Sequence, residues 1–581
     1  MTNINSENSD LPLGLGAKAE GSFIAFAAGD AIGWPVEFPS KVIGSRLKLP
    51  LTEAPFAWKR KSGGQYQPYE ESIAAGCYSD DTQMLVAVSR SRLWKGNSWW
   101  NHLAHFELPL WTIYERGGGG ATKRAAQAWL KGDAPWESRG NLPSQYFNAG
   151  GNGVAMRALA HAVHYSARKS EDCQLVQDTL RDGVITHGHP RALVGAALYA
   201  FIAHWFFRCN KTVSYGEAIE HALRTKEIWG IPPTSSESRT NWWDAVDRAY
   251  GQSKYRELWM TVCSEVEDLL QIAKRGISEG AMADDDQVLK ELGAFGREKG
   301  SGTITAVSSI YLASRFGASP VKGVLRACNA AGADTDTLAA MTGGLLGALC
   351  GFDWIPTAWL DIQDASFLRN LARQLTSGSA QEPSLLPTSP IRQRDIDTLI
   401  ESLERGEEKI LIQDRLWASV VREEPVRQLA KSTSTRAWTL KSADGQTLFA
   451  SCSRRRKAGS LQERTVDGDP QAVDQEICIL VEVENIRITE AFYVDLLGRD
   501  CVTTTDQFVK VGSVFFSETA NQANKPHGIS INITVSDFLA WSDRLLKRQK
   551  GGGPRVSTQN DSHATLIDPN GIKVTITTKS T

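Results

Sequence analysis

The chain has 581 residues, of which 41% are hydrophobic and 22% are charged, and its formal net charge is -2. This length leaves room for roughly two to four domains, and the composition is ordinary for a globular protein. The near-neutral balance argues against a protein that binds nucleic acid through bulk electrostatics. The nine cysteines are scattered without a CxxC pair, so neither a disulfide framework nor a zinc site is indicated.

The beginning of the chain is polar over residues 1–10 and lacks the apolar core of a secretory signal. The longest apolar run covers residues 192–207 and contains His204. It is short for a bilayer span, so we expect a buried helix there. These features predict a soluble, cytoplasmic protein without membrane association.

Small side chains dominate the first expected helix, residues 17–32, which runs into the segment Gly29-Asp30-Ala31-Ile32-Gly33. Such side chains let neighbouring helices approach closely, at a propensity cost for each interior glycine. Glu37 follows just past the expected helix end, between two apolar residues. Taken alone, Glu37 is best interpreted as a surface loop residue.

Two short segments combine hydroxyls and acids at the start of an apolar helix. They are Ser79-Asp80-Asp81-Thr82 and Asp334-Thr335-Asp336-Thr337. Helix capping explains each segment alone, because serine and aspartate complement the free N–H groups and the dipole of a helix start. Two carboxylates about 4 Å apart, however, repel by about 4 kcal/mol at an effective dielectric constant of about 20, so one holds a proton or a cation lies between them. Two such segments in one chain indicate halves of an acidic pocket for a hard cation such as Mg²⁺.

Three further segments are candidates for ligand binding. The four-glycine run 117–120 lacks the lysine and serine of a P-loop and is a weak phosphate motif. Residues 150–157 combine glycines with an expected helix start at Val154, and they either bind an anion or form a plain turn. His187 and His189 have no further ligand at a zinc spacing, so we interpret them as pocket wall or capping groups.

The rest of the N-terminal part has a helical pattern. Residues 210–298 are helical in pattern, and further helices are expected over residues 303–316 and 321–330. Because little strand signal interrupts them, the sequence predicts an all-α domain over residues 15–375.

These segments, in this order, resemble the ADP-ribosylglycohydrolase family, of the type that activates dinitrogenase reductase. The matching segments are Gly29–Gly33 with Pro35–Phe38, Ser79–Thr82, Gly151–Gly153 with Met156–Arg157, Thr186–Pro190, Asp334–Thr337, and Ile355–Pro356 near Trp359. No single segment is decisive, but their common order over this length is specific.

The resemblance implies an all-α bundle that binds two Mg²⁺ ions, with Mn²⁺ as an alternative, and cleaves the bond between ribose C1″ and its acceptor. By position, the metal ligands that the resemblance implies are Ser79, Asp80, Asp81, Asp334, Asp336 and Thr337. The catalytic carboxylates that it implies are Glu37, Asp80 and Asp336. The sequence does not show which of them is the general base. The substrate-binding residues that it implies are Gly119, Thr122, Gly151, Asn152, Gly153, Met156, His187 and His189.

Two positions depart from the family pattern. Ser79 stands where the family usually has threonine, which keeps the oxygen but loses the methyl group and its stiff rotamer. Ala333 stands where the family usually has a second glycine, so a need for positive φ there would strain the loop. All the expected oxygen ligands are present, which indicates a competent site.

Composition and periodicity change after residue 375. Residues 376–475 are rich in Ser, Gln, Pro and charge and form an expected intermediate region, with a short helix at 396–403 and a hairpin at 438–450. Residues 476–581 repeat a pattern of strand, helix and further strands, which predicts two β-α-β-β-β units. The expected strands are 477–483, 508–511, 513–517, 529–535, 563–567 and 572–577, and the expected helices are 488–497 and 537–548.

The C-terminal part resembles the vicinal-oxygen-chelate superfamily of glyoxalase and bleomycin-resistance proteins. The matching segments are Ala491–Tyr493 with Leu496–Gly498, and Asp568–Gly571. Catalytic members carry His and Glu ligands on inner strand faces, where this chain has Cys478 and Thr575. The resemblance therefore implies a metal-free module that binds a small ligand or a partner, or that supports assembly.

The sequence as a whole predicts a Mg²⁺-dependent hydrolase that releases ADP-ribose from an ADP-ribosylated macromolecule or small molecule. One alternative is a non-catalytic relative that binds ADP-ribose or has a structural role. Another makes the C-terminal module the active part and the helical part a sensor of ADP-ribose. Retention of every expected acid favours the hydrolase, while the acceptor linkage (arginine, serine, base or acyl) stays open.

Overall fold

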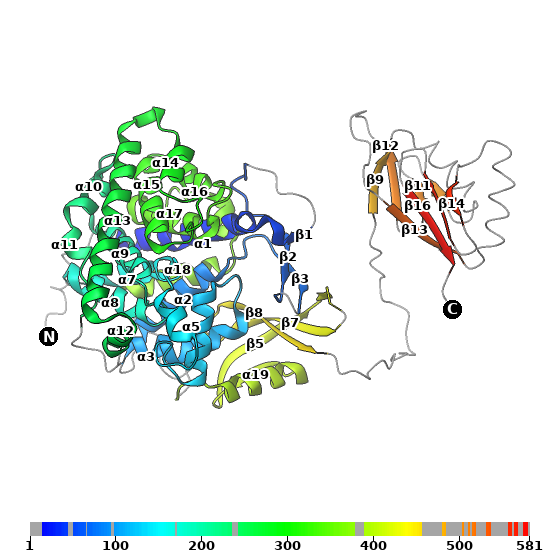
Figure 1. Ribbon diagram of the computed structural model, residues 1–581, viewed down its shortest axis with the longest axis horizontal. Helices are drawn as coiled ribbons and strands as arrows, with labels where there is room; N and C mark the ends of the chain where they lie inside the picture. Colours follow the sequence, from blue (N-terminus) through cyan, green and yellow to red (C-terminus); the bar gives the residue numbers. More distant parts are fainter. Residues whose placement is uncertain are drawn as a thin grey trace, which may run out of the picture. The chain divides into compact units, whose positions relative to one another are not determined.

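The computed structural model divides the chain into two units, Met1–Ser460 and Leu461–Thr581 (Figure 1). In the first unit it describes residues 14–43, 50–64, 67–94, 98–168, 171–234, 242–377, 389–430 and 432–455. In the second unit it describes the strands β9 to β16, whose bounds are given below.

Two antiparallel helices, α1 (Leu15–Glu37) and α17 (Thr335–Cys350), lie at the centre of the first unit. Both are rich in glycine and alanine, and their backbones approach so closely that side chains do not fit between them. A Cβ on Gly33 would lie 2.5 Å from the Thr335 carbonyl oxygen, and one on Gly21 would lie 2.0 Å from that of Gly351. The C-terminal end of α1 therefore lies beside the N-terminal end of α17.

Gly29 gives a direct test of this close packing. A Cβ at Gly29 would lie 2.4 Å from the Ala339 carbonyl oxygen, so we expect Gly29→Ala to lower the free energy of unfolding by about 3 kcal/mol. Gly16 is the matched control in the same helix, because a Cβ there meets nothing within 4 Å. Gly16→Ala should leave stability unchanged or raise it by up to about 1 kcal/mol. Urea unfolding measures both, and equal effects of the two changes would contradict the packing described here.

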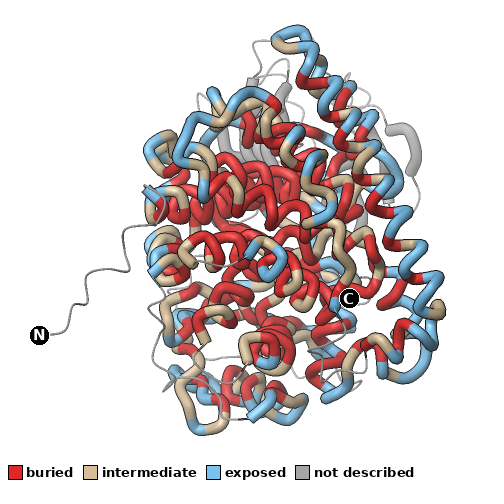
Figure 2. The backbone as a smooth tube through the Cα atoms, turned by 90° about the vertical axis from the view of Figure 1, so that its left-hand side faces the viewer, coloured by how far each residue is buried: buried red, intermediate tan, exposed pale blue. Residues whose placement is uncertain are grey.

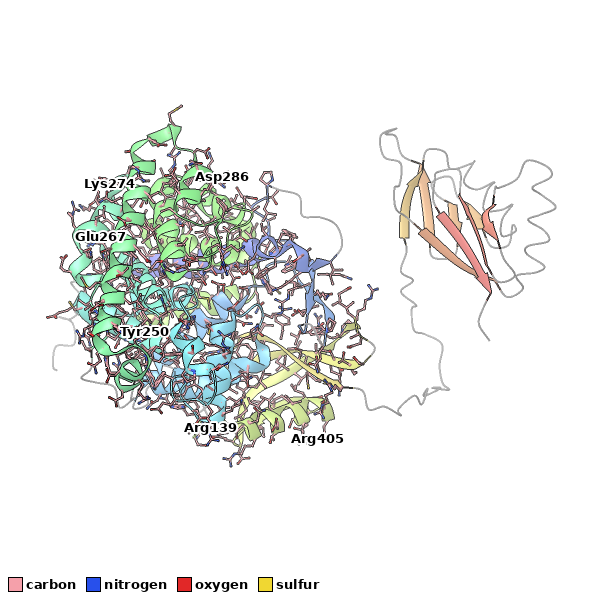
Figure 3. All side chains as sticks on the ribbon, viewed as in Figure 1. Arg139, Tyr250, Glu267, Lys274, Asp286 and Arg405 are labelled. Atoms are coloured by element: carbon pink, nitrogen blue, oxygen red, sulfur yellow. The ribbon has the colours of Figure 1, made fainter. Side chains whose placement is uncertain are left out.

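The remaining helices surround this pair, and Figure 2 shows that buried residues fill the interior of the unit. They are α2 (Asp80–Leu93), α3 (Trp99–His102), α4 (Leu108–Tyr114), α5 (Gly120–Lys131), α6 (Leu142–Phe147), α7 (Leu159–Ser166), α8 (Asp172–Val184), α9 (Pro190–Arg208), α10 (Glu217–Arg224), α11 (Lys226–Trp229), α12 (Trp242–Tyr250), α13 (Gln252–Ser278), α14 (Asp285–Glu291), α15 (Gly302–Phe316), α16 (Pro320–Cys328) and α18 (Ala365–Ser377). Charged side chains cover the outside, as Figure 3 shows for Lys274, which pairs with Glu220 at 3.4 Å.

The helices predicted over residues 17–32, 303–316 and 321–330 are confirmed with small shifts of their ends. The apolar run at 192–207 lies in α9, the one described helix that is long and apolar enough to cross a membrane; 89% of its most apolar window is buried inside the protein. The first helix is longer than predicted, because it continues through Pro35 and ends at Glu37. Glu37 is thus the last residue of a helix and not a loop residue.

The helical part contains a small sheet that the sequence did not predict. Its strands are β1 (Val42–Ile43), β2 (Trp58–Ser62), β3 (Tyr69–Ile73) and β6 (Arg427–Gln428), in the order β1-β2-β3-β6. All neighbouring strands are antiparallel. The fourth strand comes from far along the chain, so the region after the helices takes part in the sheet.

Residues 389–455 are folded as part of the first unit, in contrast to the expected intermediate region. They form α19 (Gln393–Arg405) and a sheet in the order β4 (Lys409–Ile412), β5 (Arg415–Glu424), β7 (Thr433–Ser442) and β8 (Thr447–Arg455). The expected short helix and the expected hairpin are both confirmed. The hairpin joins β7 to β8 through Gly445, whose φ of +103° only glycine adopts readily.

A buried ion pair and a cation–π contact fix this second sheet to the helical part, and a further ion pair reaches β3 of the first sheet. Arg90 on α2 donates two hydrogen bonds to Asp444, at 2.6 and 2.7 Å. Arg116, which follows α4, donates to Glu71 at 2.6 Å, and its guanidinium lies 3.7 Å from the centre of the Phe449 ring. Burial would raise the pKa of Glu71, but Arg116 and Arg60 together lower it to about 2. The two sheets therefore support the segment that leads into the glycine run 117–120.

Glu107 gives this junction a pH dependence. It is 5% exposed, and its Oε2 lies 3.7 Å from Nη1 of Arg90, which already binds Asp444. Burial raises the pKa of Glu107 from 4.5 to about 7, even though Arg90 lowers it. Because the folded state binds this proton more tightly, the stability it contributes is present below about pH 4.5 and is lost as pH rises through about 7.

We expect Glu107→Gln to remove this dependence and to raise the free energy of unfolding at about pH 8 by on the order of 3 kcal/mol. Urea unfolding of both proteins between about pH 5 and 8 measures the effect. Parallel pH profiles of the two proteins would show that Glu107 is ionised throughout.

The second unit contains two four-stranded sheets with the same strand arrangement. One has the order β10 (Val502–Thr504), β11 (Val509–Val511), β12 (Val514–Glu518) and β9 (Ile479–Val483), with β12 and β9 parallel. The other has the order β13 (Ser530–Val535), β16 (Lys573–Thr578), β15 (His563–Ile567) and β14 (Val556–Gln559), with β13 and β16 parallel. The expected helices at 488–497 and 537–548, Cys478 and the matching segment Ala491–Gly498 lie outside the described residues.

Candidate active site

Three carboxylates meet where the end of α1 lies beside the start of α17. Glu37 is the last residue of α1, and Asp334 and Asp336 stand at the beginning of α17. Their carboxylate oxygens lie within 4.8 Å of one another. The glycine-mediated packing of the two helices is thus what brings these acids together.

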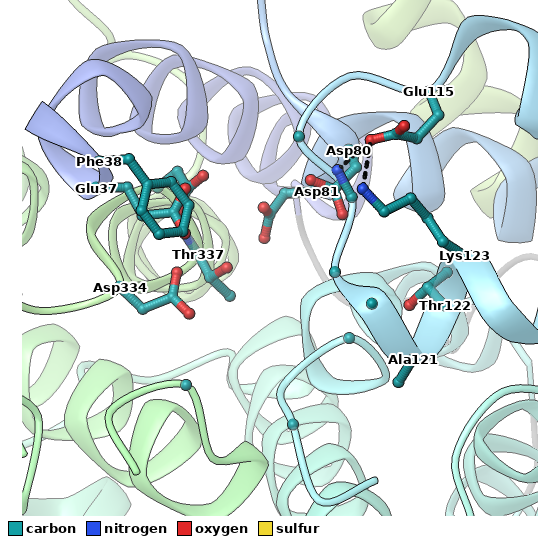
Figure 4. Close-up of a pocket in the computed structure, with 18 of the residues that line it drawn as sticks. Glu37, Phe38, Asp80, Asp81, Glu115, Ala121, Thr122, Lys123, Asp334 and Thr337 are labelled. Atoms are coloured by element: carbon teal, nitrogen blue, oxygen red, sulfur yellow. Dashed lines mark hydrogen bonds and ion pairs between the residues drawn. The ribbon is translucent and has the colours of Figure 1, made fainter. Parts of the chain in front are cut away.

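Asp80 and Asp81 reach the same place from the start of α2 (Figure 4). Asp30, buried in α1, holds this helix start through three hydrogen bonds. It accepts the backbone N–H of Ser79 at 2.9 Å, the backbone N–H of Thr82 at 3.0 Å and the Thr82 hydroxyl at 2.6 Å. The sequence prediction gave Asp30 no role, although an acid inside an otherwise apolar helix was the available signal.

The capping interpretation holds for one of the two acidic segments. Ser79 caps α2, because its Oγ accepts the backbone N–H of Asp81 at 3.4 Å. Asp334 stands at the N-cap position of α17 but makes no side-chain capping bond there. Its Oδ2 instead accepts a hydrogen bond from Asn152 Nδ2 at 3.1 Å. Capping therefore does not account for the Asp334 side chain.

The acids line a cavity of about 990 Å³. Of the predicted residues, the cavity walls include Glu37, Asp80, Asp81, Gly119, Thr122, Gly151, Asn152, Gly153, Met156, His187, Asp334, Asp336 and Thr337. Two predicted residues do not line it in the described part of the chain. Ser79 is fully buried, and His189 caps α9 by accepting the backbone N–H of Arg191 at 3.2 Å.

Burial and mutual repulsion oppose ionisation of the carboxylates at the acidic centre. Burial first, and then Asp334 and Asp80, raise the pKa of Glu37 to about 8. Burial, Glu37 and Asp334 likewise raise the pKa of Asp336 well above its usual range. Asp81 Oδ1 is buried and has no hydrogen-bond partner among the described residues. Clustered carboxylate and hydroxyl oxygens with an unpartnered buried oxygen fit a hard cation.

Comparison with known proteins decides the family. The sequence model described as ADP-ribosylglycohydrolase matches residues 12–384, which is most of the first unit. The chain belongs to the ADP-ribosylglycohydrolase family. One curated relative, the ADP-ribosyl-[dinitrogen reductase] glycohydrolase of Rhodospirillum rubrum, is 24% identical over 360 residues, which cover 62% of this chain and 94% of that protein.

The solved structures that are similar to this chain include the following two. An ADP-ribosylglycohydrolase-related protein complex matches with 20% identity and a TM-score of 0.40, over 63% of this chain and 99% of its own. TnmS3, an antibiotic binding protein from Streptomyces sp. CB03234, matches with 18% identity and a TM-score of 0.16, over 19% of this chain and 98% of its own.

Neither departure from the ADP-ribosylglycohydrolase pattern strains the backbone or removes an oxygen from the acidic centre. The positive φ in the loop before α17 belongs to Gly332, at +99°, and Ala333 does not adopt a positive φ. Lys299 Nζ donates to the carbonyl oxygens of Gly332 and Ala333 at 2.9 and 3.1 Å, which holds this loop in place. The strain considered for Ala333 is therefore absent, and Ser79 keeps its oxygen beside Asp81.

The glycine segment after α6 differs from its prediction. Gly151 forms a β-bridge with Ser301, residues 152–154 form a turn, and a 3-10 helix follows at Ala155–Arg157. No α-helix therefore begins at Val154. The backbone N–H of Asn152 donates to the Gly300 carbonyl at 2.9 Å, while its side chain reaches Asp334. Asn152 thus connects this ADP-ribosylglycohydrolase loop to the acidic centre.

Sequence reasoning missed one wall of the cavity. Phe38 and Lys41 follow α1. The end of β2 and the turn after it supply further lining residues, which are Arg60, Lys61, Ser62, Gly63 and Gly64. On another side, Lys123 pairs with Glu115 at 3.5 Å (Figure 4). The alternating pattern of residues 58–62 around a glycine turn was the available strand signal.

Proposed function

We propose that this chain hydrolyses the C1″ glycosidic bond of ADP-ribose attached to a protein or another acceptor, and so releases ADP-ribose. The observation that carries the proposal is the convergence of five carboxylates, from α1, α2 and the start of α17, on one cavity. Its volume of about 990 Å³ is that of a cleft for a ligand of nucleotide size. The family of the chain and the name of its curated relative support the same class of reaction.

The donor set fits two Mg²⁺ ions, with Mn²⁺ as an alternative. The residues that would hold them are Ser79, Asp80, Asp81, Asp334, Asp336 and Thr337. Bound Mg²⁺ would supply positive charge that orients the ribose hydroxyls and polarises the reacting oxygens. The unpartnered Asp81 Oδ1 and the mutual approach of Glu37, Asp334 and Asp336 support this assignment.

The protein's own groups provide the remaining steps. A carboxylate takes the proton of the attacking water, and the candidates are Glu37, Asp80 and Asp336. Charge that develops on the ribose ring in an oxocarbenium-like transition state is stabilised by the same acids. The glycine segments that contain Gly119 and Gly151–Gly153 allow the backbone to approach the ligand closely, and Thr122, Met156 and His187 complete the walls.

An ADP-ribose release assay on the full chain tests the proposal. Substrates with ADP-ribose on arginine, serine, a nucleic-acid base and an acyl oxygen form the panel, each with and without Mg²⁺. We expect release from at least one linkage, and Asp334→Ala should stop it. Asp286→Asn, whose side chain is 69% exposed on the outer surface, is the matched control and should leave release unchanged. Binding of ADP-ribose without release from any substrate would favour the non-catalytic alternative.

For the second unit we propose a metal-free module that binds a small ligand or a partner, or that supports assembly. In each sheet one edge strand is parallel to its neighbour, β9 to β12 and β13 to β16. This shared arrangement supports a repeated unit. Thr575 lies within β16 and pairs with Asn532 of β13. Neither residue is the His or Glu that the catalytic members of the vicinal-oxygen-chelate superfamily carry as metal ligands. A metal-dependent lactoylglutathione-lyase activity of the full chain that survives Asp334→Ala would contradict this proposal.

A further inference from the structure

His187 presents one ring nitrogen to the cavity. It lines the wall beside Gly153 and Thr122, and a Cβ placed on Gly153 would lie 3.3 Å from His187 Nε2. Among the residues that the structure describes, Nε2 has no hydrogen-bond partner. A ligand in the cavity would therefore meet Nε2, and whether it meets a donor or an acceptor depends on the tautomer.

The other ring nitrogen is fixed from behind by Thr186. Thr186 Oγ1 lies 2.8 Å from His187 Nδ1 and 2.9 Å from Nη2 of Arg157. A guanidinium only donates, so Thr186 Oγ1 accepts the bond from Arg157. The threonine is 1% exposed, and the ring nitrogen is the acceptor within reach for its hydroxyl hydrogen. Nδ1 therefore accepts, and the ring proton resides on Nε2.

Arg157 is held rigidly enough to impose this arrangement. Its side chain and that of Asp182 are both fully buried, with Nη2 and Oδ1 2.9 Å apart. Nη1 donates to the Gly153 carbonyl at 2.7 Å, so the same guanidinium fixes the glycine loop opposite His187. His161 Nε2 lies 3.1 Å from the second oxygen of Asp182. Each member of this network has a partner that leaves it little freedom.

We propose that Thr186 and Arg157 are positioning residues that hold His187 as the neutral tautomer protonated on Nε2, so that it donates a hydrogen bond to an oxygen of ADP-ribose. The inference rests on the proposed function, because it takes ADP-ribose as the ligand. Burial, together with Arg157 and Arg124, lowers the pKa of His187 to about 3, which keeps the ring neutral at physiological pH. The site thereby selects an oxygen acceptor, on the diphosphate or on a ribose, at this point of the wall.

Two amide substitutions distinguish the tautomers. Glutamine places its NH₂ near the position of Nε2, whereas asparagine places its NH₂ near that of Nδ1. Calorimetric titration of the full chain with ADP-ribose in Mg²⁺ buffer should show His187→Gln within about threefold of the wild type and His187→Asn weaker by about tenfold. Equal affinities of the two variants would overturn the inference. The same comparison with ADP narrows the position of the recognised oxygen: a persisting difference places it on the diphosphate or the adenosine ribose, and a lost difference places it on the distal ribose.

Thr186→Val removes the hydroxyl at similar volume, and Thr186→Ser is its matched control. We expect the valine variant to bind ADP-ribose about five- to tenfold more weakly and the serine variant to bind normally. Unchanged affinity of the valine variant would overturn the role of Thr186. Should the valine variant fail to fold, long-range ¹H–¹⁵N spectra of the labelled wild type decide the matter, with His187 assigned by its absence from His187→Gln.

In those spectra the inference requires a protonated Nε2 and an unprotonated Nδ1 between about pH 5 and 8. The opposite tautomer would contradict it. Failure of this inference is distinguishable from failure of the proposed function. A wild-type chain that neither binds nor releases ADP-ribose refutes both, whereas equal binding by the two His187 variants refutes only the inference.

Discussion

Asp336→Asn should abolish ADP-ribose release and at the same time stabilise the metal-free protein. The loss of one carboxylate from the centre removes a metal ligand and a candidate base, so we expect release to fall at least about a thousandfold. The carboxylate oxygens of Asp336, Glu37 and Asp334 lie within 4.8 Å of one another. An amide relieves their repulsion, so without metal the free energy of unfolding should rise by at least about 1 kcal/mol.

Thermal unfolding with and without Mg²⁺ separates the two effects. Saturating Mg²⁺ should stabilise the wild type, by about 2.7 kcal/mol at a concentration of about 100 times Kd, and should stabilise Asp336→Asn little. Asp286→Asn, far from the cavity, should respond to Mg²⁺ as the wild type does. If Asp336→Asn lost activity but unfolded earlier than the wild type without metal, the acids would not be repelling one another, and the cation site would lose its main support.

Asp182→Ala should be among the most destabilising single changes in the first unit. Asp182 and Arg157 are both fully buried, and Arg157 Nε donates to the same carboxylate at 3.0 Å. Burial alone would raise the pKa of Asp182, but Arg157 and His161 lower it, so the group is ionised in the folded protein. Its removal leaves the Arg157 charge buried without a counter-charge, which costs about 3–5 kcal/mol.

Urea unfolding measures this loss, with Asp172→Ala on the same helix as the matched control. The Asp172 side chain is 44% exposed and lies 3.4 Å from His204, so its loss should cost less than about 1 kcal/mol. A double change of Arg157→Met with Asp182→Leu should recover most of the loss, because it removes both charges from the interior. A small effect of Asp182→Ala would show that water or another acid compensates Arg157.

The fold of the helical part could be predicted from local patterns, because its helices are long, apolar and separated by glycine and proline. The close pairing of α1 with α17 could not, since it brings together segments about three hundred residues apart. The small residues of the first helix, Gly29 among them, indicated a close approach but not its partner. The strands β2 and β3 were missed because they are short and lie between helices. Pairing of β3 with β6 joins distant segments and left no signal in the local sequence.

The candidate site was predicted mainly through the order of its motifs. Capping and metal binding use the same residue types at a helix start, so the sequence alone could not show whether the Asp334 side chain caps α17. In the structure this side chain accepts a hydrogen bond from Asn152 instead. The role of Asp30 and the basic wall around Arg60 depend on tertiary contacts that local patterns do not encode. Strain was considered at Ala333 because the family usually has a glycine there. The positive φ of this loop belongs to Gly332, so Ala333 is not strained.

The most direct test is ADP-ribose release by the full chain after its metal has been removed with EDTA, followed by titration with Mg²⁺. The proposed function predicts no release from the stripped protein and a return of activity as Mg²⁺ is added, with Mn²⁺ able to replace it. Asp334→Ala should stay inactive at every concentration of either ion. Full activity of the metal-stripped protein would contradict the two-metal hydrolase.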